Sequence, residues 1–232
     1  RVWSLIISDV PGDDPSIVAS GPTVPDPSTR HDALEIVKRY RLDVPAHVIE
    51  FLETPDAETP KPGDSRFDTV TTRMIATPAR SLAAAVGVAE AAGYAVVSLG
   101  DQVEGEAREV AREQAELALA IAAGTGPVKA PAAVLSGGET TVTLTGSGRG
   151  GRNAEFALGL AIALDEHPAI SAIAGDTDGI DGSEDNAGAV VLPDTLARAL
   201  DNGVDAAARL SNNDGYGFFE AIGDLVVTGP TL

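Results

Sequence analysis

Two clusters of glycine bracket a short β-type stretch between residues 136 and 153, and the second cluster opens onto an apolar helix expected over residues 153–164. A strand, a glycine-rich loop and a helix in this order are typical of an α/β fold. Glycines at positions 146, 148, 150 and 151 carry no Cβ, so the loop backbone can come close to a ligand.

The same loop has the chemistry of an anion site. The expected helix directs its positive N-terminal end at the loop, and Arg149 and Arg152 add two guanidinium groups. Bare amides, a helix terminus and paired arginines together predict binding of phosphate or carboxylate. The residues expected to bind substrate or phosphate are Gly137, Gly138, Gly148, Arg149, Gly150, Gly151 and Asn153. A glycine turn that carries a surface arginine pair remains the alternative.

The spacing Gly146-x-Gly148-x-x-Gly151 also matches the dinucleotide-binding fingerprint. Two features disfavour that interpretation. The preceding stretch, residues 140–145, alternates with threonine, whereas the first strand of a dinucleotide fold is usually apolar throughout. The loop also contains two arginines that the fingerprint does not require.

The chain has no Gly-x-x-x-x-Gly-Lys-Ser/Thr motif and is not a P-loop protein.

Strand and helix patterns alternate along most of the chain. They predict an α/β fold, a layered sheet with helices on both faces. Strands are expected at residues 2–8, 69–76, 94–99, 132–135, 140–145, 169–174 and 225–228. Helices are expected at residues 32–40, 46–52, 78–92, 104–123, 153–164, 195–200 and 216–222. Residues 54–68, rich in Pro and acidic residues, form the best linker candidate.

Acidic residues gather after three expected strands, where ligands bind in α/β sheets. The segment 175–186 resembles a calcium loop, but Ile180 and Ala187 stand where ligands are needed. Such carboxylates could instead hold Mg²⁺ through water and substrate phosphates, although a solvated acidic turn explains the segment equally well. The candidate metal ligands are Asp9, Asp13, Glu139, Asp176, Asp178 and Asp181.

The amino-acid composition of the chain limits which partners it can bind and which cellular compartment it fits. A net charge of −19 argues against nucleic acid and anionic membranes. No apolar stretch is long enough to cross a membrane. The chain has no cysteine, which fits a cytoplasmic location and removes thiolate chemistry. Its three histidines lie in unrelated contexts, so no Ser-His-Asp triad or histidine metal site is expected.

Several long motifs resemble the glycerate 2-kinase family, whose C-terminal module is called the MOFRL domain. The matching runs cover residues 8–23, 58–64, 135–142, 148–158, 178–182 and 227–231, and together they extend over nearly the whole chain. The resemblance implies ATP-dependent phosphorylation of D-glycerate at its 2-hydroxyl, with Mg²⁺ as cofactor. It also places the family's proposed catalytic arginine at Arg152, in the Gly-Gly-Arg-Asn run.

The resemblance further implies a domain organisation. Residues 1–68 correspond to a remnant of an N-terminal glycerate kinase domain with a linker, and residues 69–232 to an α/β region with the MOFRL domain from about residue 131. The family's upstream lysine and glycine-rich segment are absent. We therefore expect a fragment that lacks the N-terminal part and is inactive in isolation.

Two other functions stay open. Many family members, especially those linked to tartrate degradation, are labelled hydroxypyruvate reductase, so an NAD(P)H-dependent reductase is the alternative enzyme. A ligand-binding module is the alternative outside catalysis. The expected partners are D-glycerate and a nucleotide, and the sequence leaves open whether the chain forms a homo-oligomer.

Overall fold

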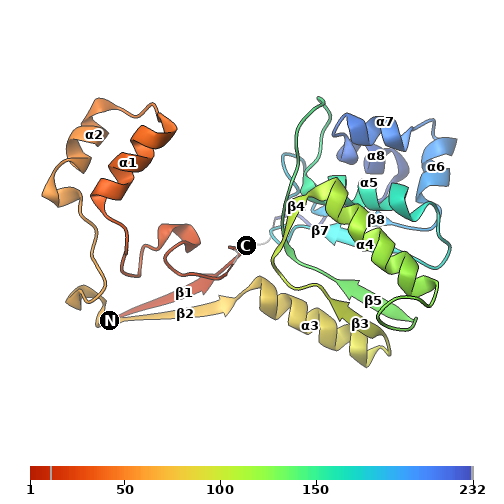
Figure 1. Cartoon of the computed structure of the whole chain (residues 1–232), viewed down its shortest axis with the longest axis horizontal. Helices are drawn as coiled ribbons and strands as arrows, with labels where there is room; N and C mark the ends of the chain where they lie inside the picture. The colour runs from red at the N-terminus through yellow and green to blue at the C-terminus, as the bar shows by residue number, and fades with distance from the viewer. Residues whose placement is uncertain (11, 231–232) are drawn as a thin grey trace. The chain divides into compact units, whose positions relative to one another are not determined.

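The computed structural model describes residues 1–10 and 12–230 (Figure 1). Contacts between residues divide the chain into two compact units, Arg1–Ser81 and Leu82–Leu232. The predicted division into residues 1–68 and 69–232 places the boundary earlier in the chain, and its interpretation as a domain remnant and an α/β region stays a prediction. Among the described residues, no helix combines the length and apolar character that a membrane crossing needs.

The first unit is built on two parallel strands, β1 (Val2–Ile7) and β2 (Val70–Ala76). Between them lie α1 (Arg30–Tyr40), α2 (Ala46–Leu52) and the short 3-10 turns η1 (Val18–Ser20), η2 (Pro55–Ala57) and η3 (Ser65–Phe67). Thr29 begins α1 with a capping box, because it and Asp32 exchange hydrogen bonds. The strand expected at residues 2–8 is present as β1, but its large apolar side chains are not buried within this unit: Trp3, Leu5 and Ile7 are 57, 62 and 65% exposed.

The second unit begins within α3 (Pro78–Ala91), and its described residues form three small sheets. In two of them the strands are parallel: β3 (Ala95–Ser98) pairs with β5 (Ala132–Leu135), and β4 (Val103–Glu106) pairs with β6 (Gly138–Thr141). The third sheet is antiparallel, in the order β7 (Ala172–Gly175), β8 (Gly188–Val191) and β9 (Leu225–Val226). The other helices are α4 (Ala107–Ala122), α5 (Arg152–Leu164), α6 (Thr195–Asp201), α7 (Ala206–Ser211) and α8 (Gly215–Ile222).

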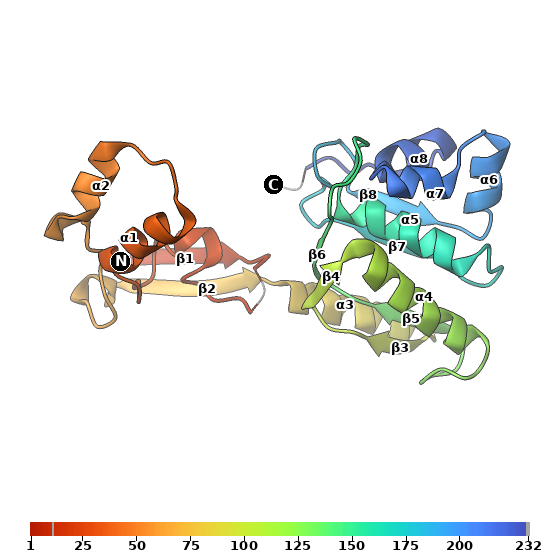
Figure 2. The same ribbon diagram turned by 45° about the horizontal axis from the view of Figure 1, so that its top comes forward.

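The hydrophobic core of the second unit surrounds α5. Leu158 of this helix and Phe218 and Phe219 of α8 are fully buried, and residues of α4 and β8 complete the cluster. Figures 1 and 2 both show α4 running alongside α5. Each large side chain buried in this way contributes about 1.5–3 kcal/mol through the hydrophobic effect. The first turn of α5 is therefore anchored to a rigid scaffold.

The predicted α/β class is confirmed, since parallel strands and helices alternate along the chain. Several boundaries are wrong. Residues 104–106 were expected to begin a helix, but they belong to β4, because they pair with β6. The strands expected at 140–145 and 169–174 lie at 138–141 and 172–175. Strand β8 and helix α7 were not predicted at all.

Candidate functional site

Arg152 is the first residue of α5, and two predicted carboxylates bind it. Its Nη2 donates to Glu139 Oε1 at 3.0 Å and to Asp176 Oδ2 at 2.7 Å, and its Nη1 also bonds Glu139. Glu139 belongs to β6, and Asp176 directly follows β7. The Arg152 side chain is 31% exposed. The structure thus brings together three predicted site residues that lie far apart in sequence, in a charge-assisted cluster open to solvent.

Asp181 has a different role from the predicted one. Its Oδ1 accepts hydrogen bonds from the backbone N and the Nδ2 of Asn153, at 2.9 and 3.2 Å, and its Oδ2 accepts from the backbone N of Ala154 at 2.7 Å. The residue is fully buried. Burial raises the pKa of Asp181, against the lowering effect of these hydrogen bonds. The assignment of Asp181 as a metal ligand is therefore corrected: it caps the N-terminus of α5, and it takes the Asn153 amide that was expected to face a ligand.

The glycine loop does not present bare amides over residues 145–149. The amide of Gly148 donates to the backbone O of Asn212 at 2.9 Å, and the amide of Arg149 donates to Asp214 Oδ1 at 3.1 Å. A Cβ on Gly146 would lie 2.3 Å from the Asn212 carbonyl, and one on Gly148 would lie 2.4 Å from the Asp214 Cβ. Because these two glycines have no side chain, the turn at residues 212–214 can pack directly against them. Their amides bond to that turn, so the expectation that they are exposed to a ligand is wrong.

The first glycine pair and Gly151 also serve contacts within the chain. Gly137 donates its amide to the Gly100 carbonyl at 2.8 Å. A Cβ on Gly138 would lie 2.1 Å from the Val103 carbonyl, and one on Gly151 would lie 2.3 Å from Asp181 Oδ1. Strand pairing and the capping carboxylate thus explain why these positions are glycine, and their role in binding phosphate stays a prediction. Gly150 has φ +136°, which favours glycine, and its binding role stays a prediction.

Arg149 pairs with different carboxylates from those that bind Arg152. Its Nη1 donates to Glu184 at 3.3 Å and its Nη2 to Glu220 at 3.0 Å. The guanidinium also lies 4.6 Å from the ring centroid of Tyr216, a cation–π distance. The two arginines were predicted as a pair, but they bind separate clusters of carboxylates. Gly150 and Gly151 lie between them in the sequence.

The other predicted metal ligands are dispersed. Asp178 accepts the Ile180 amide at 2.8 Å in a local turn. Asp9 and Asp13 lie in the first unit, after β1, and Asp13 Oδ1 is buried without a hydrogen-bond partner in the described part of the chain. Residues 1–10 and 12–230 contain no group of three or more His, Cys, Asp or Glu side chains suited to hold a metal ion.

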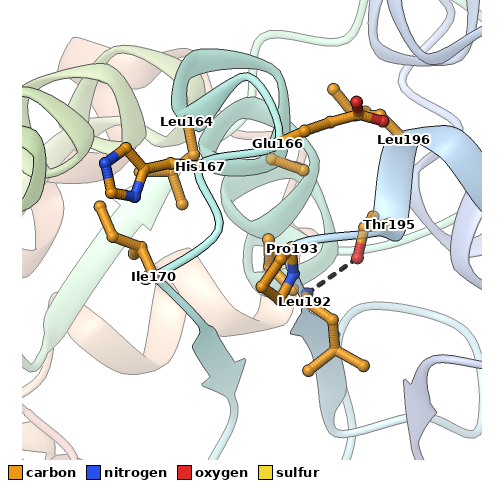
Figure 3. A pocket seen from close by; sticks show the side chains of 10 residues that line it. Leu164, Glu166, His167, Ile170, Leu192, Pro193, Thr195 and Leu196 are labelled. Carbon is orange, nitrogen blue, oxygen red and sulfur yellow. Dashed lines mark hydrogen bonds between the residues drawn. The ribbon is translucent and has the colours of Figure 1, made fainter.

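Neither of two surface cavities includes a predicted site residue. Figure 3 shows one at the C-terminal end of α5, lined by Leu164, His167, Ile170 and Leu192 among others. Its volume of about 10 Å³ has room for a single water molecule. The other, of about 250 Å³, runs along α4 and α5 and includes Arg108 and Arg112. Both arginines are bound by acids of the chain, Glu155 and Glu109 respectively.

Sequence reasoning missed the residues that hold the glycine loop. Asn212, Asn213 and Asp214 precede α8, and their side chains accept loop amides. A run of Asn and Asp in front of an apolar helix is a signal for a turn whose side chains bond to backbone. That signal could have indicated the turn, but not which distant segment it binds.

The chain is similar to known proteins in both sequence and structure. Residues 132–232 match the MOFRL family, and residues 1–53 match a domain of unknown function, DUF4147. A protein of Agrobacterium vitis named "Putative hydroxypyruvate reductase" is 54% identical over 100% of this chain and 52% of its own length. A Thermotoga maritima protein named "D-glycerate 2-kinase" is 35% identical over 100% of this chain and 54% of its own length.

A solved structure supports the same relationship. The crystal structure of a glycerate kinase from Thermotoga maritima superposes with a TM-score of 0.83 at 35% identity, over 99% of this chain and 54% of that one. This chain spans about half the length of the curated relatives it matches. The resemblance indicated by the motifs is confirmed: residues 132–232 match the MOFRL family, and the chain is similar to proteins named glycerate kinase and putative hydroxypyruvate reductase.

Proposed function

We propose that this chain is part of a longer kinase that transfers a phosphoryl group from ATP to the 2-hydroxyl of D-glycerate. Relatives named glycerate kinase, one of them named for the 2-position, support the proposal. The observation that carries it is the placement of Arg152 at the start of α5, with Glu139 and Asp176 on its guanidinium. D-glycerate and a nucleotide are the proposed partners.

Arg152 is the proposed catalytic residue. Its planar guanidinium can bind two oxygens of a phosphoryl group or of the glycerate carboxylate at once. Charge that develops on a transferring phosphoryl group is stabilised by a fixed cation of this kind. Glu139 and Asp176 hold the side chain in place, so little reorganisation is needed when an anion exchanges with one of them.

Two carboxylates beside Arg152 support a magnesium site that substrate phosphates would complete. Mg²⁺ is usually held by one or two carboxylates together with substrate phosphates, and Glu139 and Asp176 supply two carboxylates at one place. We therefore propose these two residues as its ligands. When bound there, the ion would neutralise phosphate charge. Asp181 is left out of the ligand set because both of its oxygens cap α5.

A hydroxypyruvate reductase is the second candidate, favoured by the name of the Agrobacterium relative. The loop at residues 146–151, which the dinucleotide fingerprint matches, does not support it. Its glycines fit close approaches of Asn212, Asp214 and Asp181, and the amides of residues 145–149 are bonded within the chain.

One pair of assays separates the two candidates. The full-length protein is incubated with Mg-ATP and D-glycerate while ADP formation is followed, and in parallel with hydroxypyruvate and NADH or NADPH while their oxidation is followed. We expect glycerate-dependent ADP release, and the position of the new phosphate is read by ³¹P and ¹³C NMR of the product. Oxidation of NAD(P)H without ADP release would overturn the proposal in favour of the reductase.

A further inference from the structure

A single asparagine side chain in the turn between α7 and α8 connects the glycine loop to α5. Asn213 Oδ1 accepts the amides of Thr145 and Gly146 at 2.8 and 2.9 Å, and the hydroxyl of Thr145 at 3.3 Å. Its Nδ2 donates to the Thr143 carbonyl and to Glu155 Oε1, both at 3.3 Å. Asn213 is buried, and both ends of its amide group are hydrogen-bonded.

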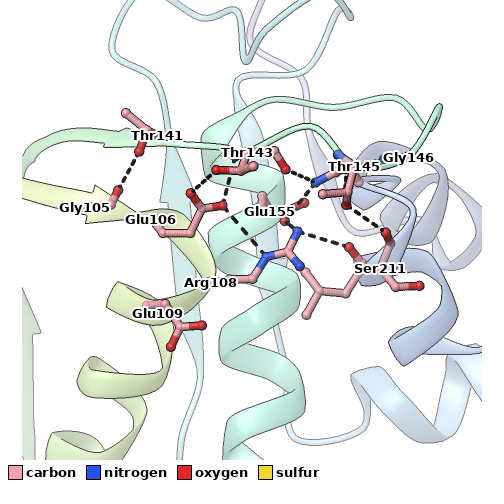
Figure 4. Close-up of polar contacts among 12 residues, drawn as sticks. Gly105, Glu106, Arg108, Glu109, Thr141, Thr143, Thr145, Gly146, Glu155 and Ser211 are labelled. Carbon is pink, nitrogen blue, oxygen red and sulfur yellow. Dashed lines mark hydrogen bonds and ion pairs between the residues drawn. The ribbon is translucent and has the colours of Figure 1, made fainter.

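Glu155 carries the connection into α5, one turn after Arg152. Its side chain is buried and also bonds Arg108 of α4, as Figure 4 shows beside Thr143 and Thr145. Burial raises the pKa of the Glu155 carboxyl, while Arg108 and Asn213 lower it. A buried polar group of this kind is tolerated when its hydrogen bonds are made. Asn213 supplies one of those bonds, so loop and helix share a partner.

The backbone between Arg149 and Arg152 is short and is hydrogen-bonded at the Arg149 end. The Arg149 amide is fixed by Asp214, and the Arg149 carbonyl accepts the Tyr216 amide at 3.0 Å. Arg152 begins α5, so only Gly150 and Gly151 separate the two. The distance between the guanidinium groups therefore depends on how the loop and α5 are held against each other.

We propose that Asn213 is a positioning residue, which holds the glycine loop on α5 through Thr145, Gly146 and Glu155 and so fixes Arg149 relative to Arg152. The inference rests on the proposed function for its effect on turnover. A role in positioning, as opposed to general stability, means that loss of Asn213 lowers kcat more than it changes substrate KM.

Two substitutions separate the functions of the side chain. Asn213 has φ +54°, a conformation that Asn, Asp and Gly tolerate. Asn213→Asp keeps an acceptor for the loop amides but replaces the donor to Glu155 with a second carboxyl. Asn213→Gly removes the whole side chain without burying a charge, so it serves if the aspartate variant does not fold. Asn202→Asp, the same change at an exposed position on the C-terminal side of α6, is the control.

The loop is tested in the 232-residue chain and the turnover in the full-length protein. By NMR hydrogen exchange, we expect the Thr145 and Gly146 amides of Asn213→Gly to exchange at least about tenfold faster, while α5 amides keep their rates. In the kinase assay we expect kcat to fall roughly 10- to 100-fold in both Asn213 variants, with KM within about twofold of the parent. Asn202→Asp should match the parent.

Three results would overturn the inference or its premise. Unchanged exchange at Thr145 and Gly146 would show that Asn213 does not hold the loop. Faster exchange with kcat near that of the parent would show that holding the loop does not position the arginines. An inactive parent would overturn the proposed function and the effect on turnover with it, whereas the exchange rates would still report on the loop.

Discussion

At the scale of single residues, the carboxylate of Asp181 organises the start of α5. The first amides of a helix have no partners within the helix. Asp181 satisfies those of Asn153 and Ala154 from a loop 28 and 27 positions away in sequence. Its position also explains Gly151, where any side chain would collide with the carboxylate. The N-terminus of α5, which was expected to bind an external anion, is thus capped by a carboxyl group of the chain itself.

Replacing Asp181 with alanine should destabilise the second unit. We expect Asp181→Ala to lower the free energy of unfolding by about 1–2 kcal/mol, as for other lost helix caps. Urea denaturation followed by circular dichroism measures the loss. Asp178→Ala is the matched control, since Asp178 is exposed and bonds only the local Ile180 amide among the described residues. Equal losses for the two variants would contradict the capping role.

The loss should also depend on pH. Because the folded pKa of Asp181 is raised above 3.8, the carboxyl stabilises the fold fully below that value and less as the pH rises through the folded pKa. The difference in unfolding free energy between parent and Asp181→Ala should therefore shrink as the pH increases. A difference that grows with pH would mean that the hydrogen bonds from α5 outweigh burial.

At the scale of elements, the contact between α4 and α5 depends on a residue without a side chain. A Cβ on Gly159 would lie 3.3 Å from the Ala111 Cβ and from the Arg108 Cα, closer than ordinary van der Waals contact. Gly159 therefore lets the two helices pack closely. In α3, by contrast, a Cβ on Gly87 would meet no atom within 4 Å.

These two helical glycines form a matched pair for substitution. We expect Gly159→Leu to lower the free energy of unfolding by roughly 1–3 kcal/mol, because overpacking forces the helices apart. Gly87→Leu should raise it by several tenths of a kcal/mol, since leucine has the higher helix propensity. Urea denaturation of both variants provides the comparison, and a stabilised Gly159→Leu would show that the helices are not packed as described.

Local signals predicted some elements and failed at others for identifiable reasons. Helix α5 was predicted because an apolar run follows a glycine loop, and α8 because apolar residues lie between a turn and Gly223. Strand β4 was missed because Val103 fits a helical period, and only the distant β6 makes it a strand. For the candidate site, the sequence predicted the types of residue, namely arginines and carboxylates. The partners of the two arginines depend on contacts between segments 13 to 71 positions apart, which no local pattern specifies.

At the scale of the whole molecule, the two units differ in how many side chains they bury. The large core cluster lies entirely in the second unit. In the first unit, the buried residues of the described part are Ser8, Val18 and Thr77, and β1 exposes Trp3, Leu5 and Ile7. Parallel strands are normally covered on both faces. The first unit is therefore expected to open at a smaller cost in free energy.

Hydrogen exchange should reveal this difference. We expect amides of β1, β2, α1 and α2 to exchange through openings of lower free energy than those of α5, whose exchange should report global unfolding of the second unit. Mass spectrometry of peptides from the intact chain measures both sets in one experiment. Equal protection of β1 and α5 would show that the chain unfolds as one cooperative body.

The 232-residue chain should not turn over glycerate by itself. It spans about half the length of its curated relatives, and phosphoryl transfer needs groups that align both the nucleophile and the phosphate. We expect no ADP formation above background with Mg-ATP and D-glycerate, while the full-length protein is active under the same conditions. Comparable turnover by the two would place the whole active site within these residues.

The central claim concerns Arg152, and its replacement in the full-length protein tests it most directly. We predict that Arg152→Ala lowers kcat for glycerate-dependent ADP formation by about two orders of magnitude or more, as expected for lost charge stabilisation, with the urea denaturation midpoint unchanged. Arg112→Ala, which removes an exposed arginine paired with Glu109 on α4, should retain the parent kcat. A well-folded Arg152→Ala protein with the kcat of the parent would contradict the account.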